Sequence, residues 1–193
     1  MMNNTPNRQK LQRGQLYFVA DIGANHDGDF DRACKLIELA KEAGAHAAKF
    51  QNFKANKIVS DGGFNSLGET GPHQKAWKKS VVETYADASV SDEWSPRLRD
   101  KCDEFGIDYF TSPYDFDSVD HADKFVDLFK IGSGDITWLE MIRYIGNKGK
   151  PVLMATGAAS MTDVYRAMAT LSDVNDEICL MQCNTNYVAD NDK

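Results

Sequence analysis

The sequence has no long apolar run, no cluster of positive charge and no closely spaced pair of cysteines. No apolar stretch approaches the roughly 18 residues of a membrane-spanning helix. The first fifteen residues, MMNNTPNRQKLQRGQ, have no apolar core of the kind that marks a secretion signal. Lys and Arg number 22 against 29 Asp and Glu, a net charge of −7, which disfavours binding to phosphate backbones. We therefore expect no membrane and no nucleic-acid partner, and residues 1–15 are expected to be a disordered tail.

The four cysteines are spread along the chain and form no C-x-x-C pair, and no histidine lies near them at the spacing of a zinc site. Cys34 and Cys102 fall on the apolar faces of expected helices, and Cys179 and Cys183 fall on one face of an expected strand. A buried cysteine behaves as a small hydrophobic residue. We therefore expect four buried free thiols, as in a reducing compartment.

Short apolar runs alternate with helical periodicity along most of the chain. Strands are expected at residues 16–20, 45–50, 107–111, 126–131, 151–155 and 178–183, and helices after Asp29, Ser91 and Ser160 and around Leu139. The strands are apolar throughout, as in parallel sheets covered on both faces. This pattern predicts an α/β fold and leaves a doubly wound sheet and a (β/α)8 barrel equally open. Residues 52–75 are rich in glycine, show no period and are expected to form a long functional loop.

Polar side chains gather where these strands end. Lys49 and Lys130 follow apolar strands, and a buried ammonium group is costly unless it is paired. Two such lysines at one sheet edge would form an anion site, although each could instead extend to solvent from a strand end. Asp21 could act as a base, orient a hydroxyl or be a simple turn carboxylate. His26, in a turn before a helix, is more typical of a structural residue.

The order of these segments resembles the sialic acid synthase family, which includes N-acetylneuraminate synthase and its legionaminate and pseudaminate relatives. The resemblance rests on ADIGANHDG, AKEAGAHAAKFQ, FTSPY, KIGSGDIT, GKPVLMATG and QCNTNY, in this order from about residue 17 to the C-terminus. It implies a (β/α)8 TIM-type barrel. The chain would be truncated after about six β/α units, so residues 16–193 would be a partial barrel without the family's C-terminal antifreeze-like domain.

The resemblance also implies the chemistry. Family members condense phosphoenolpyruvate with the open-chain aldehyde of an N-acetylated hexosamine such as N-acetylmannosamine, with a divalent metal, Mn²⁺ or Mg²⁺, polarising the aldehyde. Asp21 would contact the sugar and manage protons, in place of the family's usual Glu. The other implied site residues bind phosphoenolpyruvate (Lys49, Gln51, Ser112, Lys130 and Ser133) or contact substrate (Tyr114, Thr185 and Tyr187).

Several differences from the family lead to alternatives. The family's metal-binding histidines lie beyond the segment represented here, so no metal ligand is expected in this chain and the chain alone could be inactive. A homo-oligomer or a complementing C-terminal half is the expected partner, and a non-enzymatic half-barrel is one alternative. A Schiff-base aldolase with Lys130 as nucleophile is another. The family resemblance, together with the missing signal, predicts a cytoplasmic location.

Overall fold

The computed structural model describes residues 16–66, 79–157 and 159–184. The expected N-terminal tail therefore lies outside the described residues. Six strands form one sheet, and every strand runs parallel to its neighbours. They are β1 (Val19–Gly23), β2 (Ala47–Asn52), β3 (Asp108–Pro113), β4 (Phe129–Ile131), β5 (Val152–Ala155) and β6 (Ile178–Met181).

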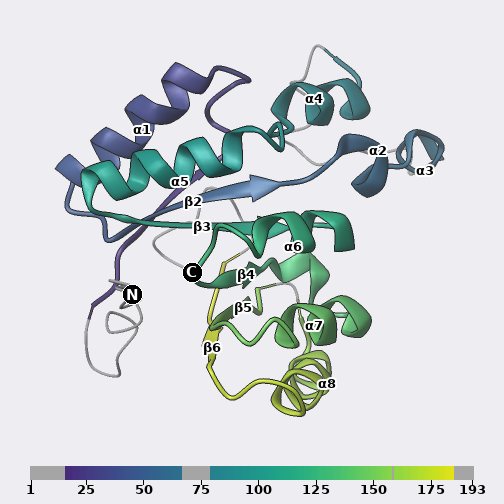
Figure 1. Cartoon of the computed structure of the whole chain (residues 1–193). Helices are drawn as coiled ribbons and strands as arrows, with labels where there is room; N and C mark the ends of the chain where they lie inside the picture. Colours follow the sequence, from purple (N-terminus) through teal and green to yellow (C-terminus); the bar gives the residue numbers. More distant parts are fainter. Residues whose placement is uncertain (1–15, 67–78, 158, 185–193) are drawn as a thin grey trace, which may run out of the picture.

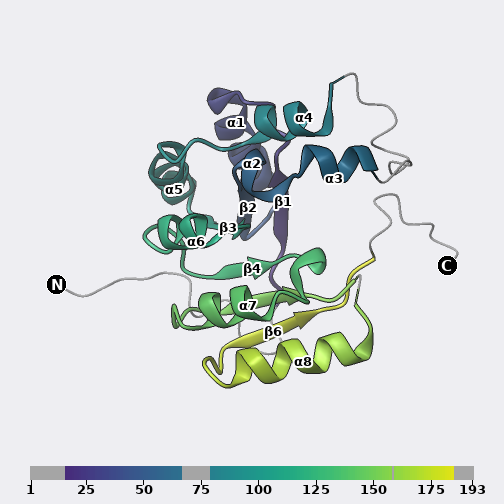
Figure 2. The same ribbon diagram turned by 90° about the vertical axis from the view of Figure 1, so that its right-hand side faces the viewer.

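The strands lie in the sheet in their sequence order, from β1 to β6. A doubly wound sheet reverses its strand order at a switch point, and no reversal occurs here. The sheet curls into a half-barrel, and helices cover its outer side (Figures 1 and 2). The order thus selects the barrel-type arrangement over the doubly wound one. The described residues form this half-barrel and do not show a closed eight-stranded barrel.

Eight α-helices lie in the described ranges. The outer layer contains α1 (Phe30–Glu42), α5 (Trp94–Phe105), α6 (Phe116–Ala122), α7 (Leu139–Gly146) and α8 (Met161–Ser172). Three further helices, α2 (Ala55–Ile58), α3 (Asp61–Ser66) and α4 (Val81–Ala88), lie between β2 and α5, beyond the carboxyl end of the sheet (Figure 1). The expectation of a loop over 52–75 is therefore wrong in part, because α2 and α3 occupy much of its described portion.

Local signals set most helix ends correctly. Asp29 accepts a hydrogen bond from the backbone N–H of Arg32 at the start of α1, and Ser160 forms a reciprocal capping box with Asp163 at the start of α8. Gly106 ends α5 in the left-handed conformation, as its position predicts. Ser91 does not cap α5, which begins three residues later at Trp94. Instead, the Ser91 carbonyl accepts from the Trp94 N–H in a preceding turn.

The core is formed by the outer face of the sheet and the inner faces of the helices, with Phe50, Phe129, Ile142 and Leu171 fully buried. The four cysteines are free, as expected. The expectation that all four are buried is wrong. Cys102 is buried, Cys34 and Cys183 are half-buried, and Cys179 is exposed. Cys179 lies on β6, the last strand of the described sheet, so no strand of the described residues covers its outer edge.

No helix in the described ranges has both the length and the apolar character needed to cross a bilayer.

Candidate active site

The strand register brings the expected site residues onto one face of the sheet. Asp21 pairs with Lys49 between β1 and β2, and Gln51 pairs with Ser112 between β2 and β3. Successive strand residues point to opposite faces, so Lys49 and Gln51 share a face. Thr111 pairs with Phe129, which places the next residue of each strand, Ser112 and Lys130, on that same face. This is the concave face, opposite the helices.

Lys49 and Asp21 form an ion pair at this face. The Lys49 Nζ lies 2.9 Å and 3.1 Å from the two carboxylate oxygens of Asp21. Lys49 is 2% exposed, whereas the Asp21 side chain is 57% exposed. Burial lowers the pKa of Lys49, the Asp21 charge opposes that shift, and nearby Lys130 adds to it. The pair therefore joins a buried cation to a carboxylate that substrate can still reach.

Lys130 adds a second positive charge to this face, and no second carboxylate is paired with it in the described residues. Its charge acts on Lys49, and within the described ranges its Nζ makes no hydrogen bond or ion pair. This face therefore carries two ammonium groups, of which only Lys49 is paired with the carboxylate of Asp21. The excess positive charge in a partly buried setting favours an anion over water. Lys49 and Lys130 thus lie on the same face of the sheet, close enough for the charge of one to affect the other; that they form one anion site stays a prediction.

The two predicted serines differ in their surroundings. The Ser112 Oγ is buried and has no hydrogen-bond partner in the described part of the chain. A buried polar group without a partner is uncommon in a native structure and is typical of a ligand site. The Ser133 Oγ, in a 3-10 turn after β4, accepts from the backbone N–H of Gly157 at 3.0 Å. Ser133 is thus fixed by the loop after β5, and its own hydroxyl proton can still be donated.

Tyr114 connects these residues to the next loop. The Gln51 Nε2 donates to the Tyr114 Oη at 3.2 Å, and the Phe53 ring lies edge-on to the Tyr114 ring at 6.0 Å. Gly132 lies between this phenol and a carboxylate: a Cβ atom at Gly132 would be 3.0 Å from Asp135 Oδ2 and 3.8 Å from Tyr114 Oη. A side chain at position 132 would therefore crowd the site.

Asp135 follows the fourth strand with Lys130 and Ser133, and the sequence assigned it no role in the site. The 3-10 turn of residues 133–135 places its carboxylate in the cavity beside Tyr114, and burial raises the pKa of Asp135. The only sequence signal was its position directly after Gly-Ser-Gly, where a turn can redirect a side chain. Thr185 and Tyr187, expected to contact substrate, lie outside the described residues.

A cavity of about 800 Å³ opens beside the anion site and shares Gln51 and Tyr114 with it. Its opposite wall comes from α2 and α4, through residues such as Lys57, Thr84 and Tyr85. This wall was not predicted, because residues 52–75 show no period and no helix was expected at residues 81–88. The volume is within the range of small-molecule sites.

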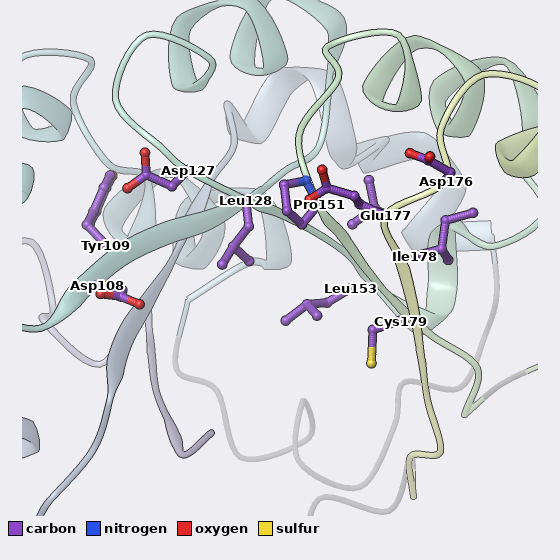
Figure 3. Close-up of a pocket in the computed structure, with 11 residues that line it drawn as sticks. Asp108, Tyr109, Asp127, Leu128, Pro151, Leu153, Asp176, Glu177, Ile178 and Cys179 are labelled. Atoms are coloured by element: carbon purple, nitrogen blue, oxygen red, sulfur yellow. The ribbon is translucent and has the colours of Figure 1, made fainter. Parts of the chain in front are cut away.

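A second hollow, of about 280 Å³, lies at the other end of the sheet (Figure 3). It is lined by residues at the amino ends of the strands, among them Asp108, Asp127 and Glu177. Barrel-type enzymes place their chemistry at the carboxyl ends of the strands, so this hollow is separate from the candidate site.

His26 is fully buried in the turn after β1. Its Nδ1 accepts from the backbone N–H of Gly28 at 3.1 Å, and its ring lies edge-on to Trp94 with centroids 5.2 Å apart. Burial lowers the pKa of His26, which favours the neutral ring. These contacts support the structural role expected for it.

The described residues contain no group of three His, Cys, Asp or Glu side chains placed to bind a metal ion. The expected divalent metal therefore has no ligand set of this kind in the described part of the site.

The model of the NeuB family matches residues 36–193. The chain belongs to the NeuB family. It is 30% identical over 176 residues to N-acetylneuraminate-9-phosphate synthase from Homo sapiens, covering 89% of this chain and 47% of that protein. It is also 30% identical over 182 residues to N,N'-diacetyllegionaminic acid synthase from Legionella pneumophila, covering 90% of this chain and 50% of that protein.

This NeuB-family chain also resembles a solved structure, the N-acetylneuraminic acid synthetase from Leptospira borgpetersenii crystallised with citrate. The TM-score is 0.77 at 22% identity, covering 94% of this chain and 61% of that one. At this identity the likeness establishes the fold alone. The chain spans about half the length of the curated relatives it matches.

Proposed function

We propose that this chain provides the phosphoenolpyruvate-binding part of a sugar-acid synthase. The proposed reaction condenses phosphoenolpyruvate with an N-acetylated hexosamine and releases inorganic phosphate. Membership of the NeuB family and the names of the sugar-acid synthases it resembles support the reaction class. The structural observation that carries the proposal is that Lys49, paired with Asp21, lies on one face of the sheet with Lys130 and with the buried Ser112 hydroxyl, which has no partner in the described residues.

Phosphoenolpyruvate matches this arrangement in charge, because it carries a carboxylate and a phosphate. In the proposed complex, Lys49 and Lys130 bind its anionic groups, and Ser112, Ser133 and Gln51 donate hydrogen bonds to its oxygens. Lys49 is held in place by Asp21 before substrate arrives, so little side-chain entropy is lost on binding. Lys130, which has no such partner in the described residues, gains one from the substrate.

The proposed chemistry balances with one water molecule. The methylene carbon of phosphoenolpyruvate forms a bond to the aldehyde carbon, and the aldehyde oxygen takes up a proton to become a hydroxyl. Water adds to the resulting cationic carbon and loses a proton, which leaves a hydroxyl and the phosphate ester on one carbon. This hydroxyl then loses its proton as a carbonyl forms, the carbon–oxygen bond to phosphate breaks, and inorganic phosphate takes up the proton and leaves. The exposed carboxylate of Asp21 is positioned to accept a hydrogen bond from a sugar hydroxyl or to hold a proton during these steps.

Isothermal calorimetry of phosphoenolpyruvate binding tests the proposal. The double variant Lys49→Ala, Lys130→Ala is expected to lose detectable binding. The double variant Lys35→Ala, Lys124→Ala changes the net charge equally at two exposed positions and is the matched control. Equal affinity in the two double variants would refute the proposed site. Phosphate release on adding N-acetylmannosamine, measured with Mn²⁺ supplied, then tests the complete reaction.

A further inference from the structure

The cavity beside the anion site has a near end and a far end. If phosphoenolpyruvate binds at Lys49 and Lys130, the acceptor aldehyde must approach it near Gln51 and Tyr114, which the anion site and the cavity share. The remainder of an extended sugar then projects toward the opposite wall, formed by α2 and α4. The chemistry of this wall therefore bears on which substituents the acceptor carries at its far end.

Apolar and aromatic side chains make up much of that wall. Phe53 and Tyr85 contribute rings whose centroids lie 5.6 Å apart, Ile58 and Ala88 add aliphatic surface, and Trp138 lines the cavity from the segment before α7. Thr84 provides a hydroxyl. Such a wall suits the C–H faces and methyl groups of an uncharged sugar, and it would leave a charged group poorly solvated.

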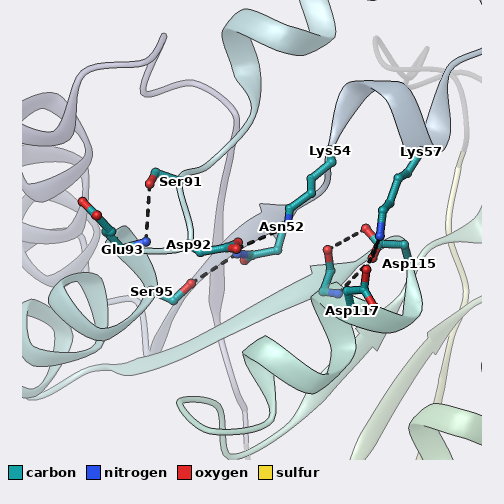
Figure 4. Close-up of polar contacts among 10 residues, drawn as sticks. Asn52, Lys54, Lys57, Ser91, Asp92, Glu93, Ser95, Asp115 and Asp117 are labelled. Atoms are coloured by element: carbon teal, nitrogen blue, oxygen red, sulfur yellow. Dashed lines mark hydrogen bonds and ion pairs between the residues drawn. The ribbon is translucent and has the colours of Figure 1, made fainter.

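Lys57 is the only cation among the described residues that line this cavity, and its charge is already neutralised (Figure 4). Its Nζ lies 3.3 Å from Asp115 Oδ1 and also binds the Asp117 carboxylate. Asp115 is 7% exposed and is itself fixed, since it accepts from the Ser118 N–H at 3.0 Å and from the Ser118 hydroxyl at 2.7 Å. Two carboxylates on one ammonium leave a net negative charge.

The other charged groups that line the cavity are carboxylates, Asp27 after β1 and Asp135 beside Tyr114. Asp27 is paired with Arg32, whose guanidinium lies 2.8 Å from its Oδ2, so this nearby cation is occupied as well. A phosphate group on the acceptor would meet the neutralised Lys57 at the far wall and carboxylates elsewhere in the cavity, and like charges brought together disfavour binding.

We propose that the acceptor of this chain is an amino sugar without a terminal phosphate. The inference rests on the proposed function and specifies its substrate class. The relatives differ in this respect by name: one is an N-acetylneuraminate-9-phosphate synthase and the other an N,N'-diacetyllegionaminic acid synthase. The cavity wall groups this chain with synthases of uncharged acceptors.

A binding competition tests this. The full chain, labelled with ¹⁵N and saturated with phosphoenolpyruvate in EDTA, is titrated with N-acetylmannosamine or with N-acetylmannosamine 6-phosphate, and amide shifts are followed by NMR. We expect the neutral sugar to bind at least about tenfold more tightly, because a phosphate adds nearly two negative charges. Tighter binding of the phosphorylated sugar, or binding of neither sugar, overturns the inference. Failure of phosphoenolpyruvate to bind in the first step instead overturns the proposed function.

Charge-changing variants make the test specific to the wall. Thr84→Arg adds a cation to the wall and is expected to tighten binding of the 6-phosphate, while Thr84→Gln adds length without charge and is expected not to. Asp117→Asn should also tighten it, since this change releases part of the Lys57 charge. Asp92→Asn, at an exposed carboxylate paired with Lys54, is the control of equal charge change. Equal effects of Asp117→Asn and Asp92→Asn would contradict the role assigned to Lys57.

Discussion

Lys49 and Asp21 form an ion pair in which one partner is buried and the other is exposed. The Lys49 side chain is 3% exposed, and its ammonium contacts both oxygens of a carboxylate whose side chain is 57% exposed. This asymmetry couples stability to function. The fold needs the carboxylate to compensate a buried cation, and the proposed reaction uses its exposed side.

Replacing Asp21 by Asn is expected to lower the free energy of unfolding by about 2 kcal/mol at neutral pH. This is below the usual cost of breaking a fully buried pair, because water reaches Asp21. Burial holds the pKa of Lys49 below its ordinary value, so between that lowered pKa and the ordinary one the unfolded chain binds more protons than the folded chain. Stability from this group therefore rises with pH across that window.

The substitution Asp21→Asn removes the charge that raises the Lys49 pKa. The pH range over which stability rises therefore extends to lower pH in the variant. The loss of unfolding free energy in the variant should become smaller as pH rises through this range, because Lys49 is then uncharged in the folded protein. Urea unfolding from pH 7 to 10 measures the difference between variant and wild type. A deficit that stays constant with pH would show that Lys49 and Asp21 are not coupled.

Ser112→Ala is expected to separate binding from stability. Its buried hydroxyl has no partner in the described residues, so its removal should change the unfolding free energy by less than about 1 kcal/mol. Phosphoenolpyruvate binding should weaken by about tenfold, corresponding to one hydrogen bond to a charged group. Calorimetry and urea titration on the same sample give both values. The control Ser118→Ala removes a hydroxyl that donates to Asp115 and should lose stability instead.

Gly146→Ala is expected to destabilise the protein by about 1–3 kcal/mol through overpacking at the end of α7. A Cβ at this position would lie 2.6 Å from Val174 Cγ2 and 2.8 Å from Leu171 Cδ1. The gain of about 1 kcal/mol in helix propensity does not offset this crowding. Gly62→Ala, where a Cβ meets nothing within 4 Å, serves as the matched control and should be neutral or stabilising. Thermal melts that rank the two variants in the opposite order would refute the packing argument.

Lys130 also tests the Schiff-base alternative. Incubation with pyruvate and borohydride followed by mass spectrometry is expected to give no covalent adduct, because the proposed reaction uses Lys130 only as a cation. A mass increase that maps to Lys130 and disappears in Lys130→Arg would favour the aldolase over the synthase. Arg retains the charge, so Lys130→Arg should keep more phosphoenolpyruvate affinity than Lys130→Ala.

The sequence alone predicted the number and approximate positions of the strands and most helix ends, and it placed Lys49 and Lys130 at the ends of strands. Apolar runs of strand length, the capping residues Asp29 and Ser160 and the glycine at 106 are local signals, and each is read within a few residues of chain. Boundaries were less accurate: β1 begins at Val19, three residues after the predicted start, and β4 covers only the second half of the predicted 126–131.

Contacts between segments far apart in the sequence required the tertiary structure. Sequential strand order selected the half-barrel over the doubly wound sheet, and the position of β6 at the edge of the described sheet left Cys179 exposed. The wall of α2 and α4, with Lys57 neutralised by two carboxylates, likewise had no local signal, and the Gly-Ser-Gly before Asp135 did not show that its carboxylate lies beside Tyr114. Local backbone preference and periodicity depend on neighbours in the chain, whereas burial, pairing and charge balance depend on what the folded chain brings together from a distance.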